Sequence, residues 1–215
     1  MGCFLQMFIM NTFLPMESST FLVMAYDRYV AVCIPLRYLT IMSPRFCLHM
    51  VAGCWIGGSI SSFIHTVYPM HFPICGSREI HHFFCEVPVL IKLSCEDTSV
   101  YQLVVVVTSI VLLVVPFSLI IASYTLIFLT VLRMNSVKGR KKALATCSSH
   151  LTAVLLFYCS AFLRHIVPTL GSPQELIFSV QYSVITPLMN PLIYSLKNNE
   201  VKAAMQRTFR KYLHC

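Results

Sequence analysis

One short stretch of the chain holds residue types that can bind a transition metal. His81, His82, Cys85 and Glu86 stand close together, and imidazole, thiolate and carboxylate groups are all metal ligands. The alternative is that Cys85 belongs to a disulfide, which removes its thiolate from the ligand set. The sequence contains no CxxC pair, HExxH helix, GxSxG elbow or GxxxxGK[ST] phosphate loop. We therefore expect neither a metal cofactor nor an enzyme.

A second group of polar residues stands within strongly apolar sequence. Glu17 is the one acid deep inside such a stretch, where we expect it to face other helices and accept hydrogen bonds. Asp27 and Arg28 stand at the end of that stretch and have two interpretations. Their charges can extend to a membrane interface, or the arginine can change partners between two helix arrangements. His150 lies in a similar stretch, where interhelical hydrogen bonding is the simpler role. Asn190 precedes Pro191 in the last apolar stretch, where the simpler role of the proline is a static helix kink.

The composition indicates which elements position these residues. The chain has 215 residues, of which 57% are hydrophobic and 11% charged, and its mean hydropathy is +0.73. An ordinary soluble domain is about 25% charged, so this chain has too few polar side chains to cover a water-facing surface. Its apolar residues form five blocks, each long enough for a membrane-spanning helix of roughly 20 residues. The predicted spans are about 2–33, 46–67, 99–132, 142–164 and 175–196.

We therefore predict an all-α fold, a polytopic transmembrane helix bundle that forms a single domain. The uncharged block at 98–132 is too long for one perpendicular span, so one end should lie in a loop or extend past the membrane. After the last span, residues 199–212 are predicted to form an amphipathic helix on the membrane surface. The lipid bilayer is thus the first expected partner.

The basic residues predict the orientation of the bundle. Most of the 16 Lys and Arg residues follow the first, third and fifth blocks, which places Cys215 in the cytoplasm and Met1 outside. The net charge of +8 then reflects orientation and attraction to anionic lipid, so it requires no nucleic-acid partner. Four cysteines fall on the oxidising side and allow two disulfides in any of three pairings: Cys3, Cys75, Cys85 and Cys95.

Four motifs carry a family resemblance. They are MAYDRYVAVCIPLRY at 24–38, HHFFCEVPVLIKLSCED at 81–97, KALATCSSH at 142–150 and PLMNPLIYSLKNNEVKAA at 187–204. In this order and spacing they closely resemble vertebrate olfactory receptors, a branch of the rhodopsin-like G protein-coupled receptors. The resemblance covers essentially the whole chain. It begins at the third helix of the family's seven-helix fold, so we expect helices three to seven and the short eighth helix.

The resemblance implies specific roles for several residues. Cys3 would pair with Cys85, and Cys75 with Cys95. Arg28 would be the switch arginine that faces a G protein at the inner end of the bundle, and two tyrosines would move toward it on activation. The implied switch residues are Asp27, Arg28, Tyr29, Tyr124, His150, Asn190, Pro191 and Tyr194.

By the same resemblance, a small volatile odorant would bind near the outer third of the bundle. Mostly apolar walls with a few hydrogen-bonding groups suit such a ligand. Two residues depart from the family pattern: His165 stands where Tyr is common, and Pro15 where a small residue is usual. The implied ligand-binding residues are Met10, Asn11, Leu14, Thr108, Ser109, Leu112, Tyr158, Ala161, Phe162, His165 and Val180; Tyr158 takes the place of the usual toggle tryptophan.

Three functional hypotheses follow from the sequence. The resemblance implies a multi-pass odorant receptor of the plasma membrane that signals through a stimulatory heterotrimeric G protein. A competing hypothesis is a truncated, non-signalling fragment or pseudogene product retained in the endoplasmic reticulum, because losing two helices would leave polar faces exposed to lipid. A small transporter is the third, but only Glu17 lies deep in a span and no inverted repeat is visible. The nearly complete motifs favour the receptor family, and the loss of two helices keeps the non-signalling hypothesis as the alternative for these 215 residues.

Overall fold

The computed structural model describes residues 2–73, 75, 85, 87–166, 173–197, 204 and 207. Within these residues every extended regular element is helical and no β-strand is formed, so the predicted all-α class is confirmed. In chain order the elements are α1 (Gly2–Cys33), η1 (Pro35–Arg37), α2 (Tyr38–Ile41), α3 (Pro44–Val67), η2 (Tyr68–His71), α4 (Val87–Leu93), α5 (Ser99–Ser109), η3 (Ile110–Val114), α6 (Val115–Arg133), α7 (Val137–Ile166), α8 (Pro173–Val180), η4 (Gln181–Ile185) and α9 (Thr186–Lys197).

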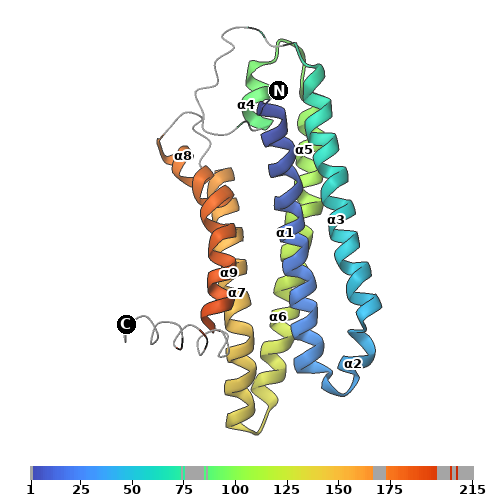
Figure 1. The fold of residues 1–215 in the computed structure, drawn as a ribbon, viewed down its shortest axis with the longest axis vertical. Coiled ribbons are helices and arrows are strands. Elements are labelled where there is room, and N and C mark those ends of the chain that lie inside the picture. The colour runs from blue at the N-terminus through green and yellow to red at the C-terminus, as the bar shows by residue number, and fades with distance from the viewer. Residues whose placement is uncertain are drawn as a thin grey trace.

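Helix α1 is the centre of the bundle. Figure 1 shows α3 on one side of it and α7 with α9 on the other. A Cβ atom at Gly58 of α3 would lie 2.7 Å from Cγ of Met16 and 3.0 Å from the carbonyl oxygen of Thr12. One turn further along α3, Ser62 donates a hydrogen bond of 2.6 Å to the carbonyl oxygen of Phe8. Small residues thus let α3 approach the backbone of α1 closely, a packing mode typical of membrane helices.

Helices α5 and α6 form one long helical path from Ser99 to Arg133, joined by the π-helical turn η3. The first alternative expected from the sequence, a loop at one end of this block, is therefore wrong, and the second, an extension past the membrane, stays a prediction. The π turn lies just before Pro116, whose nitrogen cannot supply the α-helical donor to the carbonyl of Leu112. A wider turn accommodates the proline ring, as π-helical turns often do inside longer helices.

A second π-helical turn lies in the last helical path. There η4 joins α8 to α9, and the hydroxyl of Thr186 donates to the carbonyl oxygen of Gln181 at 3.0 Å. The preceding helix, α7, begins at Val137, five residues before the predicted start at 142. Its first turn is capped by Ser136, whose Oγ accepts a hydrogen bond from the backbone N–H of Gly139 at 3.2 Å.

The described residues include three helical stretches long and apolar enough to cross a membrane: Pro44–His71, Ser99–Arg133 and Val137–Leu163. Helix α1 adds a fourth when it is taken together with η1 and α2, across a bend of 113°. In the region of the fifth predicted span the apolar helix described, Ile177–Ile193, is shorter. Large apolar side chains cover the outward faces of these helices, as expected where the surrounding solvent is lipid. The predicted surface helix over 199–212 lies outside the described residues, apart from Ala204 and Arg207.

Two apolar clusters join α1, α6 and α7. In the larger cluster Ile120 of α6 and Phe157 of α7 are completely buried, and Phe21 of α1 meets the Phe157 ring edge-on at 5.4 Å. The second cluster lies toward the end of these helices at which α1 stops and α6 turns into α7, which we name the inner end after the predicted topology. Tyr124 packs against both clusters, so it spans the middle and the inner end of the bundle. The buried members of the inner cluster are Ile127, Val131, Ala143 and Cys147.

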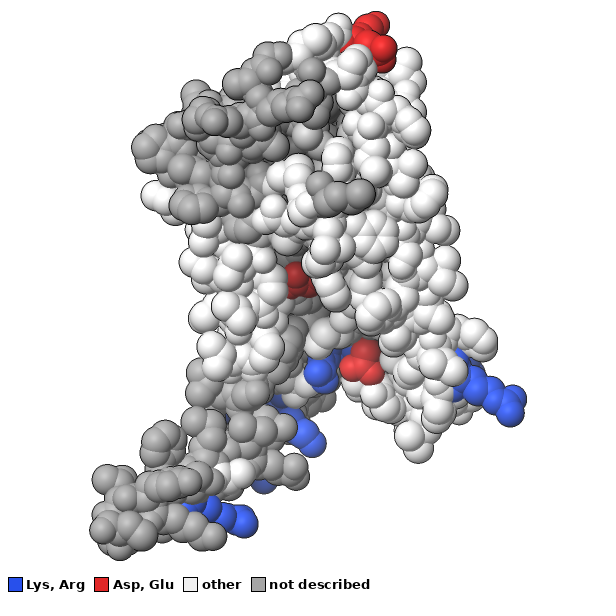
Figure 2. All heavy atoms as spheres, turned by 45° about the horizontal axis from the view of Figure 1, so that its top comes forward, with Lys and Arg blue, Asp and Glu red and all other residues white. Residues whose placement is uncertain are grey.

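Most of the described charged side chains lie at the two ends of the molecule, and Glu17 lies between them. Lys and Arg side chains gather where α1 ends and where α6 turns into α7, whereas Glu96 and Asp97 stand at the opposite end, before α5 (Figure 2). Hydrogen bonds from the hydroxyl and the backbone N–H of Ser99 hold the pKa of Asp97 below its ordinary value of 3.8. This separation of basic from acidic side chains corresponds to the uneven distribution of Lys and Arg between the loops found in the sequence.

Candidate functional site

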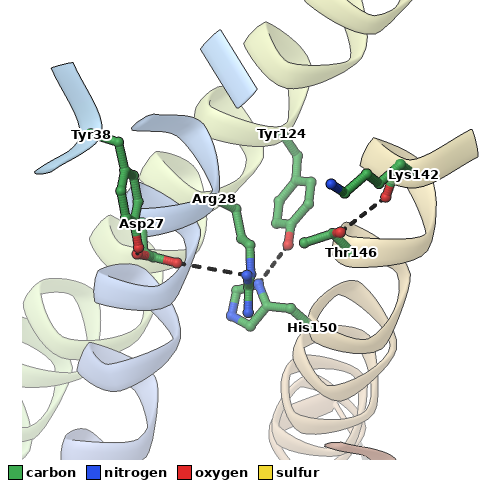
Figure 3. Close-up of polar contacts among 7 residues, drawn as sticks. All are labelled: Asp27, Arg28, Tyr38, Tyr124, Lys142, Thr146 and His150. Atoms are coloured by element: carbon green, nitrogen blue, oxygen red, sulfur yellow. Dashed lines mark hydrogen bonds and ion pairs between the residues drawn. The ribbon is translucent and has the colours of Figure 1, made fainter. Parts of the chain in front are cut away.

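The inner end of α1 carries an ion pair. Nη1 of Arg28 lies 3.8 Å from Oδ2 of Asp27, and the two side chains are 30% and 25% exposed (Figure 3). Tyr38 of α2 donates its hydroxyl to Oδ1 of Asp27 at 2.8 Å. That bond to a carboxylate raises the pKa of Tyr38 above its ordinary value of 10.0. Because a partly exposed ion pair contributes only about 0–1 kcal/mol, Arg28 can separate from Asp27 at little cost while Tyr38 keeps the carboxylate in place.

A buried hydrogen bond between α6 and α7 lies beside this ion pair. The hydroxyl of Tyr124 and Nδ1 of His150 are 2.6 Å apart, and Figure 3 shows Arg28 extending from α1 toward the two rings. His150 is completely buried, and its ring centroid is 5.7 Å from that of Phe21. The inner ends of α1, α6 and α7 therefore meet around Arg28, Tyr124 and His150.

The remaining predicted switch residues lie further from Arg28, Tyr124 and His150, or have side chains outside the residues that the structure describes. Asn190 of α9 donates its side-chain N–H to the carboxylate of Glu17, which links α9 to α1 in the middle of the bundle. Pro191 lies inside α9, and Tyr29 packs against the inner apolar cluster. The side chain of Tyr194 lies outside the described residues. The structure thus connects Asn190 of the predicted set to Glu17, which sequence reasoning treated separately.

A chain of hydrogen bonds crosses the bundle above the switch. Oγ of Ser18 lies 2.8 Å from the carbonyl oxygen of Leu112 and 2.8 Å from the hydroxyl oxygen of Tyr158. A carbonyl oxygen only accepts, so Ser18 donates to Leu112 and accepts from Tyr158. Ser18 is fully buried, and its donor replaces the one that Pro116 cannot provide. One serine of α1 thereby joins η3 to α7.

The predicted ligand-binding residues fall into several groups in the structure. Leu14, Tyr158 and Ala161 meet in the larger apolar cluster. Thr108 contacts His65 of α3, a residue that the sequence did not single out. Phe162 is 44% exposed. The side chain of His165 lies outside the described residues, and those of Met10, Asn11, Ser109, Leu112 and Val180 are partly buried.

An open groove with a volume of about 330 Å³ lies between α1 and α6. Leu22, Tyr26 and Tyr29 line it from α1, and four residues line it from α6. This volume is in the range of small-molecule sites. Its walls include none of the predicted ligand-binding residues, so it is separate from the predicted odorant site. Its α6 wall is formed by Leu119, Ala122, Ser123 and Leu126.

The four cysteines that the sequence predicts to lie outside the cell pair as the family resemblance implies. Cys3 is joined to Cys85, with Cα atoms 5.3 Å apart, and Cys75 to Cys95, with Cα atoms 5.6 Å apart. The first disulfide ties the start of α1 to the segment before α4, and it removes Cys85 from any metal-ligand set. Among the residues that the structure describes, no group of three or more His, Cys, Asp or Glu side chains could hold a metal ion. His81, His82 and Glu86 lie outside those residues.

Sequence reasoning missed several residues that the structure brings to the site. Leu36 and Leu39, in the segment that follows the ion pair, are 99% and 87% exposed. Apolar residues in a basic, water-facing segment were a usable signal, because a large exposed side chain of this type commonly marks a contact surface. Tyr38 and Ser18 gave no comparable signal, since their roles depend on groups from other segments.

Comparison with known proteins identifies the family. A family model described as olfactory receptor matches residues 1–212. Human olfactory receptor 2AG2 is 52% identical over 214 residues, which covers 99% of this chain and 68% of that protein. Human olfactory receptor 2AG1 is 50% identical over the same shares, and human olfactory receptor 2T2 is 49% identical over 96% of this chain and 64% of its own length. The chain spans about two thirds of the length of these relatives, which are receptors and not enzymes. By sequence, motifs and helical fold, this chain belongs to the olfactory receptor family.

Proposed function

We propose that this protein binds a small volatile odorant between its helices and passes the signal to a heterotrimeric G protein of the stimulatory type. The observation that carries the proposal is the meeting of Arg28 with Tyr124 and His150 at the inner ends of α1, α6 and α7 (Figure 3). Three helices that can separate or close around one cation form a two-state element, which a ligand can bias.

The switch works through the weakness of its ion pair. At 3.8 Å and with partial exposure, the bond between Arg28 and Asp27 costs about 1 kcal/mol or less to break. Tyr38 retains Asp27, so the arginine moves while the carboxylate stays. The Tyr124–His150 bond must lengthen if α6 and α7 separate. The inner end can therefore open without exposing an unpaired aspartate.

The odorant site would lie above the switch, among the ligand-binding residues implied by the resemblance. Support comes from Tyr158 and Leu112, which belong to that set and also to the hydrogen-bond chain through Ser18. A ligand that displaces either residue would strain contacts between α1, η3 and α7. A ligand that binds one arrangement of these helices more tightly then shifts the equilibrium between the open and closed arrangements around Arg28.

The surface for the G protein would be the inner end of the bundle. Leu36 and Leu39 extend from the segment beside the ion pair, and the basic residue Arg37 stands between them in the sequence. An exposed apolar side chain within a charged rim is a common form of transient protein interface. We assign the stimulatory class of G protein by family resemblance.

The proposal includes the topology. Five spans would place the start of α1 outside and the end of α9 in the cytoplasm, with the protein in the plasma membrane. The positive-inside pattern, the two external disulfides and the apolar outer faces of the helices support this topology. The spans would correspond to α1, α3, α5 with α6, α7, and α8 with α9.

The test is a cAMP reporter assay in cells that express the chain, measured over an odorant panel and normalised to surface labelling. We expect a ligand response that Arg28→Ala abolishes without lowering expression, because alanine cannot reach α6 or α7. Lys92→Ala is the control, since Lys92 lies in α4, at the end of the bundle opposite Arg28 (Figure 1). Unchanged signalling by Arg28→Ala would remove Arg28 from the mechanism. Absence of any response, with the chain confined to the endoplasmic reticulum, would contradict the proposed function.

A further inference from the structure

A histidine outside the predicted site contacts one of its walls. His65 of α3 is 8% exposed, and its Nε2 lies 2.8 Å from Oγ1 of Thr108 on α5. The ring is held by Tyr101, whose own ring is tilted against it with the centroids 6.1 Å apart. The Tyr101 hydroxyl also donates to the carbonyl oxygen of His65 at 3.2 Å. His65 is thus fixed in place beside Thr108.

The surrounding oxygens determine which way the protons point. Oγ1 of Thr108 lies 2.8 Å from the carbonyl oxygen of Val104 and 3.0 Å from that of Val105. Carbonyl oxygens accept and never donate, so the single hydroxyl hydrogen of Thr108 points back into its own helix. Toward His65 the threonine can only accept. Nε2 of His65 therefore carries a hydrogen and is the donor.

The second ring nitrogen agrees with this assignment. A neutral imidazole carries one hydrogen, so Nδ1 of His65 is then a bare acceptor. Nδ1 is buried and has no hydrogen-bond partner among the residues that the structure describes. The other tautomer would bury an unpaired N–H at this position, and unpaired buried polar groups are rare in folded proteins.

The assignment has a consequence for ligand choice. A threonine hydroxyl has one hydrogen and two lone pairs; the hydrogen and one lone pair of Thr108 are already engaged. The second lone pair of the Thr108 hydroxyl is left for a ligand, and it can only accept a hydrogen bond. An alcohol or phenol can donate to it, whereas a ketone or an aldehyde presents only lone pairs and is disfavoured.

We infer that His65 is a positioning residue that holds Thr108 as a hydrogen-bond acceptor, so that the odorant site selects ligands carrying a hydroxyl group. The inference rests on the proposed function, because Thr108 is a wall of the proposed odorant site. It adds to that function a chemical class of ligand and a determinant on α3.

The tautomer can be tested without any ligand. The chain is labelled with ¹⁵N-histidine, reconstituted in lipid nanodiscs and measured by NMR, and the resonances of His65 are assigned by their loss in His65→Gln. We expect a protonated Nε2 and a bare Nδ1. A bare Nε2 with a protonated Nδ1 would overturn the inference and leave the proposed function standing.

Ligand choice is tested with matched probes, 1-octanol against 2-octanone and benzyl alcohol against benzaldehyde. Binding is followed by the thermal shift of the nanodisc-embedded chain and by the cAMP reporter. We expect a preference for the alcohols of about tenfold, the scale of the net contribution of one neutral hydrogen bond. His65→Phe should reduce the preference, whereas His65→Gln, whose amide N–H can donate, should retain it.

Thr108→Val completes the experiment, because valine keeps the shape of threonine without the hydroxyl. It should abolish the preference, and His65→Phe should then have no further effect in the double variant. A preference that survives Thr108→Val, or a loss in His65→Phe that His65→Gln shares, would overturn the inference. If no probe binds or signals although the chain is folded and the NMR tautomer is as expected, the proposed function fails instead.

Discussion

Replacing Ser18 with alanine should destabilise the bundle by about 1–3 kcal/mol. The serine is fully buried and makes two hydrogen bonds of 2.8 Å, one to the carbonyl of Leu112 and one from Tyr158. Interhelical hydrogen bonds in membrane proteins contribute about 0.6 kcal/mol on average and about 1.7 kcal/mol at most, so the range is the sum for two. Alanine removes only one oxygen atom, so no cavity of consequence adds to this value.

The matched control is the next residue in the chain. Ser19 donates only to the carbonyl of Pro15 in its own helix, at 2.8 Å. Ser19→Ala should therefore change the free energy of unfolding by no more than about 0.5 kcal/mol. Two neighbouring serines with the same chemistry then differ in burial and in whether the hydroxyl reaches another helix.

The assay is reversible unfolding in mixed micelles, followed by circular dichroism as the denaturing detergent is titrated. A double-mutant cycle of Ser18→Ala with Tyr158→Phe should give a coupling energy of about 0.6–1.7 kcal/mol. Equal effects of Ser18→Ala and Ser19→Ala would refute the claim that Ser18 joins three helices. Strict additivity in the cycle would refute the bond between Ser18 and Tyr158.

Three further outcomes are expected. The pKa of Tyr38 is raised above 10.0, so its bond to Asp27 stabilises the fold below about pH 10 and is lost as the pH rises through the folded-state pKa; Tyr38→Phe should flatten the alkaline side of the melting curve against pH. Gly58→Ala should cost about 1–3 kcal/mol of unfolding free energy in the same micelle titration because its Cβ would meet α1 at 2.7 Å, whereas Gly57→Ala, with nothing within 4 Å, should be neutral. Leu36→Ala should weaken G protein coupling in the reporter assay about tenfold without changing thermal stability, since the side chain is 99% exposed and available to a partner.

The helical stretches could be predicted from the sequence because charge in the hydrocarbon region is costly. The first predicted span, 2–33, has the bounds of α1, and the second, 46–67, lies within α3. Helix α7 begins five residues before the predicted membrane span at 142, because a helix can continue beyond the hydrocarbon region that it crosses. Ser136 caps that helix in water, and its first turns carry solvated lysines that the hydropathy pattern excluded.

The site was less predictable because its contacts join distant residues. Ser18 and Ser19 are indistinguishable in the sequence, and only the carbonyl of Leu112 and the hydroxyl of Tyr158 decide between them. Likewise, Pro116 predicts a disturbed helix but not a π-helical turn, because the turn depends on the hydrogen-bond donor that the neighbouring helix supplies. The pairing of the external cysteines came from family resemblance, since the residues alone allowed three arrangements.

The most direct test of the account is the side of the membrane on which the segment beside Arg28 lies. Leu36→Cys and Met70→Cys each place one exposed thiol, at opposite ends of the bundle, and labelling with a membrane-impermeant maleimide in sealed microsomes is compared with the unmodified chain. The account predicts that Leu36→Cys is labelled at once, because the cytoplasmic face of a microsome is outermost, and that Met70→Cys is protected until detergent is added. Immediate labelling of Met70→Cys with protection of Leu36→Cys would place Arg28 on the wrong side for any G protein and contradict the proposed mechanism.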